Sequence, residues 1–120
     1  MAQPFVHMEL NTPDLGKAKD FYGQLCGWSF NDIDMGGPAG VYSVFKPSDG
    51  PGGGIYSMQG TPTAWLPYIG VENLKESTDK AIALGAKVIM REQEVPGHGS
   101  FSMIVDPTGA SVALWQAKTA

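Results

Sequence analysis

Apolar and polar residues alternate along most of this chain, and only two stretches repeat at the spacing of a helix. Within residues 5–10 the alternation around His7 predicts a strand. Residues 14–26 instead place an apolar side chain every three or four positions, which predicts a helix. The apolar stripe of this helix consists of Leu15, Ala18, Tyr22 and Leu25. Three further strands are expected after it, over 28–35, 40–47 and 53–58.

The second half of the chain repeats this order of elements. We expect a strand over 65–71, a helix over 74–84 and strands over 87–90, 101–105 and 111–115. Asn73 is the expected cap of the second helix, with Glu76 in a capping-box pattern, and Thr12 is the expected cap of the first. Turn-forming residues at the element boundaries predict turns at 36–39, 48–52, 96–99 and 106–109.

The doubled order predicts the fold class: α+β, with two βαβββ modules over about residues 4–59 and 64–118. Three matching pairs of residues share a constant offset of 59 positions, namely Leu15 and Leu74, Asp20 and Asp79, and Leu25 and Leu84. Each module is too short to bury its own sheet face. The modules are therefore expected to pack on each other, within a single domain over residues 1–120, or on a second copy of the chain.

Composition and charge exclude several classes of protein. The 120 residues are 42% hydrophobic and 17% charged, which is typical of a globular domain. The net charge is −4 and the 8 basic residues are scattered, so nucleic acid is not an expected partner. No apolar run approaches a membrane span or a signal peptide, so we expect a cytoplasmic protein without a membrane partner. The single cysteine, Cys26, is expected to be buried and excludes an intramolecular disulfide.

Two groups of motifs resemble those of a known family. The first comprises Asp14-Leu15, Phe21-Tyr22-Gly23 and Leu25-Cys26-Gly27-Trp28, and the second is Asp106-Pro107-Thr108-Gly109-Ala110. Together with the doubled βαβββ order, they resemble the vicinal-oxygen-chelate (VOC) superfamily, which comprises glyoxalase, bleomycin-resistance and dioxygenase-like proteins. The resemblance covers nearly the whole chain and implies curled mixed sheets that form a cup. It does not select one activity, because members include lyases, epimerases, dioxygenases, thiol transferases and proteins that only sequester bleomycin.

The resemblance also implies where the family's divalent metal would bind. The strand positions that carry metal ligands in the family fall on His7, Tyr56, Leu66 and Ala113. Only His7 is one of the usual ligands, and a lone imidazole does not hold a divalent ion, because such sites need three or four donors. No cofactor is therefore expected, and a divalent metal is not favoured.

His7 and Glu9 are the main candidates for chemistry. They lie two residues apart in a strand, so both side chains point to the same face, which the resemblance places inside the cup. There they could shift each other's pKa, act as a base or hydrogen-bond a ligand. The alternative is that they lie at the sheet margin, solvated or bonded to each other.

Apolar and aromatic residues at the same strand parity are the second group of candidates. They are Tyr56, Leu66, Tyr68, Ala113 and Trp115. A cup lined by them suits a flat or aliphatic small molecule, although aromatic residues in strands are most often core. The glycine-rich stretch 49–54 lacks the lysine and the following helix of a phosphate-binding loop, so it is interpreted as a connector or edge loop.

Two functional hypotheses follow. The first is a metal-independent protein that binds a small apolar or aromatic molecule. It is favoured because three of the four family ligand positions lack a usual metal ligand. The alternative is a glyoxalase-like metal-dependent lyase, isomerase or dioxygenase with relocated ligands, Glu9 among them. Whether the chain is an enzyme stays open, and no catalytic residue is assigned. Two open sheets leave edges and apolar faces uncovered, so a homodimer is expected.

Overall fold

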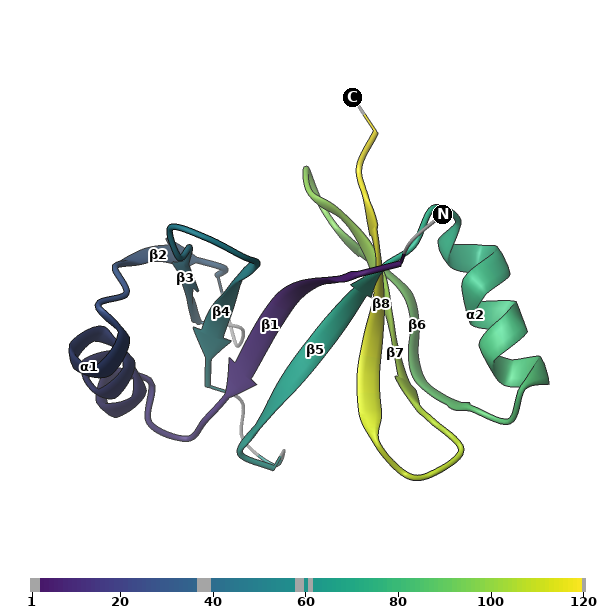
Figure 1. Cartoon of the computed structure of the whole chain (residues 1–120), viewed down its shortest axis with the longest axis horizontal. Coiled ribbons are helices and arrows are strands. Elements are labelled where there is room, and N and C mark those ends of the chain that lie inside the picture. The colour runs from purple at the N-terminus through teal and green to yellow at the C-terminus, as the bar shows by residue number, and fades with distance from the viewer. Residues whose placement is uncertain (1–2, 37–39, 58–59, 61, 120) are drawn as a thin grey trace. The chain divides into compact units, whose positions relative to one another are not determined.

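One helix and a set of strands recur in each of two units of the chain (Figure 1). The structure is a computed structural model that describes residues 3–36, 40–57, 60 and 62–119. The N-terminal unit is His7–Leu66, and the C-terminal unit combines Met1–Val6 with Pro67–Ala120. The start of the chain therefore belongs to the C-terminal unit.

The N-terminal unit packs helix α1 on one face of four strands. Its elements are β1 (Phe5–Asn11), whose first two residues belong to the other unit, α1 (Leu15–Cys26), β2 (Phe30–Asp34), β3 (Val41–Phe45) and β4 (Gly52–Tyr56). The strand order is β2-β3-β4-β1, with β1 parallel to β4 and the other pairs antiparallel. Leu10, Phe45 and Ile55 form the core. Three of the four residues of the predicted α1 stripe pack against it, namely Leu15, Ala18 and Tyr22, whereas Leu25 is 67% exposed, so its place in the stripe was predicted wrongly.

The N-cap of helix α1 is not the residue that was predicted. Asp14 is its N-cap, because its carboxylate accepts a hydrogen bond from the Lys17 amide at 3.0 Å. The expected cap, Thr12, instead accepts a hydrogen bond from the Asp14 amide through its hydroxyl at 3.3 Å. The prediction of Thr12 as the cap was therefore wrong, since that hydroxyl supports the turn before the helix.

The C-terminal unit repeats the arrangement with α2. Its elements are β5 (Ala64–Gly70), which begins in the other unit, α2 (Leu74–Ala83), β6 (Lys87–Val95), β7 (Gly99–Val105) and β8 (Ser111–Ala117). Strand β5 is parallel to β8, and β8-β7-β6 continue antiparallel. Val71, Leu74, Ile104 and Leu114 form its core. The mixed sheets and the repeated βαβββ order confirm the predicted α+β fold class.

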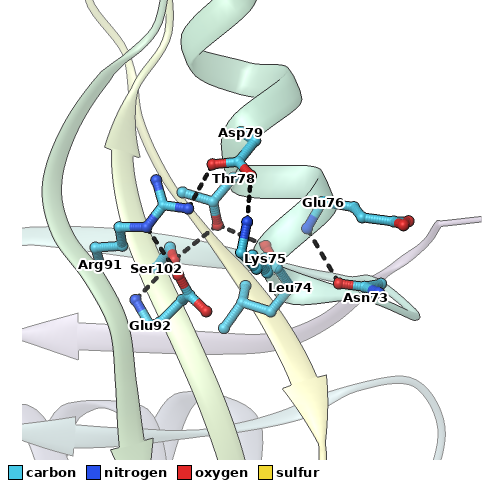
Figure 2. Close-up of polar contacts among 9 residues, drawn as sticks. All are labelled: Asn73, Leu74, Lys75, Glu76, Thr78, Asp79, Arg91, Glu92 and Ser102. Atoms are coloured by element: carbon cyan, nitrogen blue, oxygen red, sulfur yellow. Dashed lines mark hydrogen bonds and ion pairs between the residues drawn. The ribbon is translucent and has the colours of Figure 1, made fainter.

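Buried hydroxyl groups join α2 to the sheet of the C-terminal unit (Figure 2). The Thr78 hydroxyl donates to the Leu74 carbonyl at 2.7 Å and lies 2.9 Å from the Ser102 hydroxyl, which also accepts from the Glu92 amide. Asn73 caps α2 as predicted, because its side chain accepts from the Glu76 amide at 3.0 Å. On the surface, Asp79 pairs with Lys75 and Arg91.

Three other expectations need correction or completion. Strand β4 begins at Gly52, so residues 52–54 do not belong to the connector or edge loop predicted over 49–54, and the strand predicted from residue 53 was the better assignment. Strand β6 continues to Val95, beyond the predicted end at residue 90. Cys26 is exposed because it ends a helix that has no fully buried residue. The turn at 106–109 is confirmed by a 3.0 Å hydrogen bond from the Gly109 amide to the Asp106 carbonyl.

Two expectations lie partly outside the described residues. The predicted turn at 36–39 includes residues 37–39, and the predicted strand 53–58 includes residue 58, none of which the structure describes. Neither helix in the described part of the chain is long and apolar enough to cross a membrane.

Candidate functional site

Strands β1, β3 and β4 bring a group of polar and aromatic side chains to the sheet face opposite α1. Alternation along β1 sends Leu10 into the core beneath α1 and turns His7 and Glu9 to the other face. The strand register places Glu9 opposite Gly54, and Tyr42 opposite Tyr56.

The hydroxyl of Tyr42 lies between the two candidate residues of β1. It is 2.8 Å from Nε2 of His7 and donates to Oε1 of Glu9 at 2.9 Å. The structure therefore joins His7 and Glu9 through a third side chain. All three are half-buried, so these hydrogen bonds are partly sheltered from water.

Gly54 creates the space that Tyr42 occupies. A Cβ atom at Gly54 would lie 2.1 Å from Cζ and 2.3 Å from the hydroxyl oxygen of Tyr42. The phenol ring thus crosses β4 over a residue without a side chain, and so reaches β1 from β3. Glycine inside a strand commonly marks such a close approach.

Burial and charge shift two pKa values in this group. Burial lowers the pKa of His7 below its usual value of 6.5, which favours the neutral imidazole. Burial, and then the charge of Glu9, raise the pKa of Tyr56 above 10.0, so its phenol stays protonated at neutral pH. The group therefore combines one carboxylate, a neutral imidazole and two phenols, which suits hydrogen bonding to an uncharged partner.

The remaining predicted site residues divide between the units. Tyr68 lies opposite Ala113 and contacts the ring of Trp115, with ring centres 6.4 Å apart, on the sheet face of the C-terminal unit that points away from α2. Ala113 has no exposed surface. Leu66 is half-buried in the part of β5 that belongs to the N-terminal unit. That all seven residues line one pocket stays a prediction.

Trp115 also lines a groove of about 470 Å³ in the C-terminal unit. The groove runs between the start of the chain, the end of β5 and the first turn of α2. Its other lining residues include Val6, Val71, Glu72 and Glu76. None of the other predicted site residues reaches it.

The fold itself is shared with solved structures of very different sequence. The hypothetical protein BH1468 from Bacillus halodurans C-125 aligns with a TM-score of 0.79 at 10% identity, over 100% of this chain and 98% of that one. Methylmalonyl-CoA epimerase from Mycobacterium tuberculosis aligns with a TM-score of 0.72 at 11% identity, over 96% of this chain and 88% of that one.

Sequence comparison finds similar proteins for most of the chain. Residues 4–42 match the family model described as "Bleomycin resistance protein-like N-terminal". A Mycobacterium bovis protein named "Putative glyoxylase CFP32" is 36% identical over 115 residues, which is 92% of this chain and 44% of that protein. A second relative, "Anthracycline biosynthesis protein DauV" of Streptomyces sp. (strain C5), is 30% identical over 90% of the chain and 45% of its own length. In sequence and in fold, the chain is therefore similar to proteins of the VOC superfamily.

The chain spans less than half the length of the curated relatives that it matches. At the family's metal positions its donors fit a divalent ion poorly. Leu66 and Ala113 carry no donor atom, and the raised pKa of Tyr56 disfavours the phenolate that a metal would bind. Within the ranges that the structure describes, no three His, Cys, Asp or Glu side chains gather as a metal site would require.

Sequence reasoning missed Tyr42, whose hydroxyl hydrogen-bonds to both His7 and Glu9. Its strand was expected, but nothing in the spacing of β3 distinguishes Tyr42 from a core aromatic residue. The usable signal was the glycine run 52–54, because glycines inside a strand pattern indicate that something approaches closely. From the sequence, these glycines were interpreted only as evidence of a connector or edge loop over 49–54, although a strand was also expected from residue 53, and so the signal was not used.

Proposed function

We propose that this chain is a member of the VOC superfamily that binds a flat, largely apolar small molecule without a metal ion. The binding surface is the sheet face of the N-terminal unit that carries His7, Glu9, Tyr42 and Tyr56. The observation that carries the proposal is the Tyr42 hydroxyl, which joins an imidazole and a carboxylate on a half-buried face.

The aromatic rings around these polar groups support a flat ligand. The rings of Tyr42 and Tyr56 lie with centres 6.0 Å apart, and the His7 ring is within 9° of parallel to Tyr42. Small-molecule sites commonly combine such apolar surfaces with a few polar groups that fix orientation. Because the lowered pKa of His7 favours the neutral imidazole, the site offers no positive charge at His7, and a ligand with an anionic group there is not expected.

The name of one relative suggests a first probe. The DauV protein is named for anthracycline biosynthesis, and anthracyclines contain a flat hydroxylated ring system. Alizarin, a dihydroxyanthraquinone, presents the same kind of surface in a smaller molecule. We expect alizarin to bind this chain with 1:1 stoichiometry by calorimetric titration.

Variants of the site test the proposal. His7→Ala or Glu9→Ala should weaken alizarin binding by about 1–3 kcal/mol for each group lost. Their effect on unfolding should be smaller, because a half-exposed side chain leaves no dry cavity when it is removed. Lys75→Ala, an exposed change in the other unit, is the matched control and should bind as the wild type does. Equal affinities in all four proteins, or a loss of folding in both site variants, would contradict the proposal.

A glyoxalase-like enzyme is the second candidate, because the relative with 36% identity is named a putative glyoxylase. That activity would require metal ligands other than those at the family's positions. Adding zinc separates the two candidates, since an ion at 100 times its dissociation constant stabilises a folded protein by about 2.7 kcal/mol. A thermal shift of that size, abolished by His7→Ala, would favour the enzyme, and our proposal expects none.

A further inference from the structure

The Tyr42 hydroxyl makes hydrogen bonds to two partners, and it has one hydrogen to give. An ionised Glu9 can only accept, so the 2.9 Å contact with Oε1 uses the Tyr42 hydrogen. The 2.8 Å contact with Nε2 of His7 must then run in the other direction, with the imidazole donating to the Tyr42 oxygen.

This direction fixes the proton on the imidazole. A neutral imidazole carries one N–H, and here that N–H is at Nε2. The lone pair is therefore on Nδ1. Any hydrogen bond that Nδ1 makes is one that it accepts, whichever group supplies the donor.

We infer that Tyr42 is a positioning residue that holds His7 in its Nε2–H tautomer, so that Nδ1 is the acceptor atom of the imidazole.

Gly54 is what allows the Tyr42 hydroxyl to reach His7 and Glu9. The Tyr42 oxygen reaches His7 and Glu9 only because the phenol passes over Gly54, where a Cβ would lie 2.3 Å from that oxygen. Gly54→Ala should therefore displace the Tyr42 hydroxyl without removing it from the protein. Tyr42→Phe makes the complementary change, since it removes the hydroxyl and keeps the ring.

Long-range proton–nitrogen NMR correlations of the ¹⁵N-labelled full chain test the tautomer directly. The chain has only two histidines, and His98 lies exposed in a turn, so it serves as a reference within the same spectrum. In the ligand-free wild type above neutral pH, we expect His7 to show a protonated Nε2 and an unprotonated Nδ1.

The variants decide whether Tyr42 is responsible. Tyr42→Phe and Gly54→Ala should both shift the His7 tautomer ratio toward a mixture and leave the signals of His98 unchanged. A wild-type spectrum with the proton on Nδ1 overturns the inference by itself, even if neither variant folds. An unchanged His7 ratio in a folded Tyr42→Phe protein also overturns it.

Discussion

At the residue scale, the positions of Tyr42 and Gly54 depend on each other. The phenol ring occupies the space that any larger residue at position 54 would fill. Gly54 does not have the positive φ angle that restricts other residues, so its requirement comes from contact with Tyr42 and not from its backbone conformation. The effect of a substitution at position 54 therefore depends on which residue is at position 42.

A stability cycle tests this dependence. Gly54→Ala should destabilise the protein by about 1–3 kcal/mol, because the new Cβ forces the ring of Tyr42 out of place. Adding Tyr42→Ala to that variant should recover part of the loss, which would appear as a non-additive coupling in urea unfolding. Gly16→Ala in α1, whose nearest atom would be 3.9 Å away, is the control and should not destabilise. Strict additivity of the two site changes would refute the contact.

The lowered pKa of His7 links stability to pH. Above 6.5, the usual pKa, the imidazole is neutral in both folded and unfolded chains. As the pH falls below that value, the unfolded chain binds a proton that burial keeps off the folded one, so the free energy of unfolding decreases. The slope for one proton is at most about 1.4 kcal/mol per pH unit.

Urea unfolding between about pH 8 and pH 5 measures this effect. We expect His7→Gln to flatten the loss of stability in that range, and His98→Gln to leave it unchanged. The carboxyl groups of Asp32, Asp79 and Asp106 act in the same direction, but their pKa values are lowered from 3.8, so their effect falls at lower pH. An identical slope in His7→Gln and the wild type would show that His7 does not contribute.

At the element scale, helix α2 is held to its sheet by hydrogen bonds as well as by apolar contacts. The Thr78 hydroxyl uses its hydrogen on the Leu74 carbonyl, so the Ser102 hydroxyl donates to Thr78 (Figure 2). Ser102 in turn accepts from the amide of Glu92, which has a positive φ of 48° in an irregular part of β6. Helix, central strand and edge strand thus share one chain of hydrogen bonds.

Thr78→Val removes one hydroxyl from this chain and preserves the shape of the side chain. Both hydroxyls are fully buried, so Ser102 is left without its acceptor and the expected loss of stability is about 1–3 kcal/mol. Lys75→Gln breaks only an exposed ion pair of the same helix and should cost at most about 1 kcal/mol. Equal losses for the two variants in thermal unfolding would contradict a special role for the buried hydroxyls.

Elements with a local signal could be predicted from the sequence, and contacts between elements could not. The Asn73 cap and most of the α1 stripe depend on residues a few positions apart, and they were found. Strand β6 was predicted too short because residues 91–94 are all polar, a pattern that resembles a loop but is tolerated in an edge strand paired on one side only. The spacing of His7 and Glu9 indicated a shared face, whereas the hydroxyl between them comes from a strand about 35 residues away.

At the scale of the whole molecule, both units leave large apolar side chains exposed. In the N-terminal unit the most exposed are Phe21 and Leu25, and in the C-terminal unit Leu84 and Ile89. Each of these four side chains is more than half exposed. Exposed apolar side chains commonly mark a protein interface where they gather in a patch.

We expect the chain to form a homodimer, since closed twofold pairs are the commonest assembly of soluble proteins. Light scattering at micromolar concentration should give twice the chain mass of 12.8 kDa. Leu25→Glu and Ile89→Glu place a charge on one unit each, and the variant that returns to the monomer mass identifies the unit that supplies the interface. A wild-type mass equal to a single chain would refute the dimer.

The exposed position of Cys26 has a practical consequence for all of these measurements. Because it is the only cysteine in the chain and its side chain is exposed at the end of α1, a maleimide dye can be attached at one defined place without introducing or removing any other thiol. A dimer would then carry two identical dyes, and energy transfer between chains labelled with different colours would report how fast subunits exchange. The same thiol also makes a reducing buffer necessary, since two chains could otherwise become linked by a disulfide that is unrelated to their natural assembly.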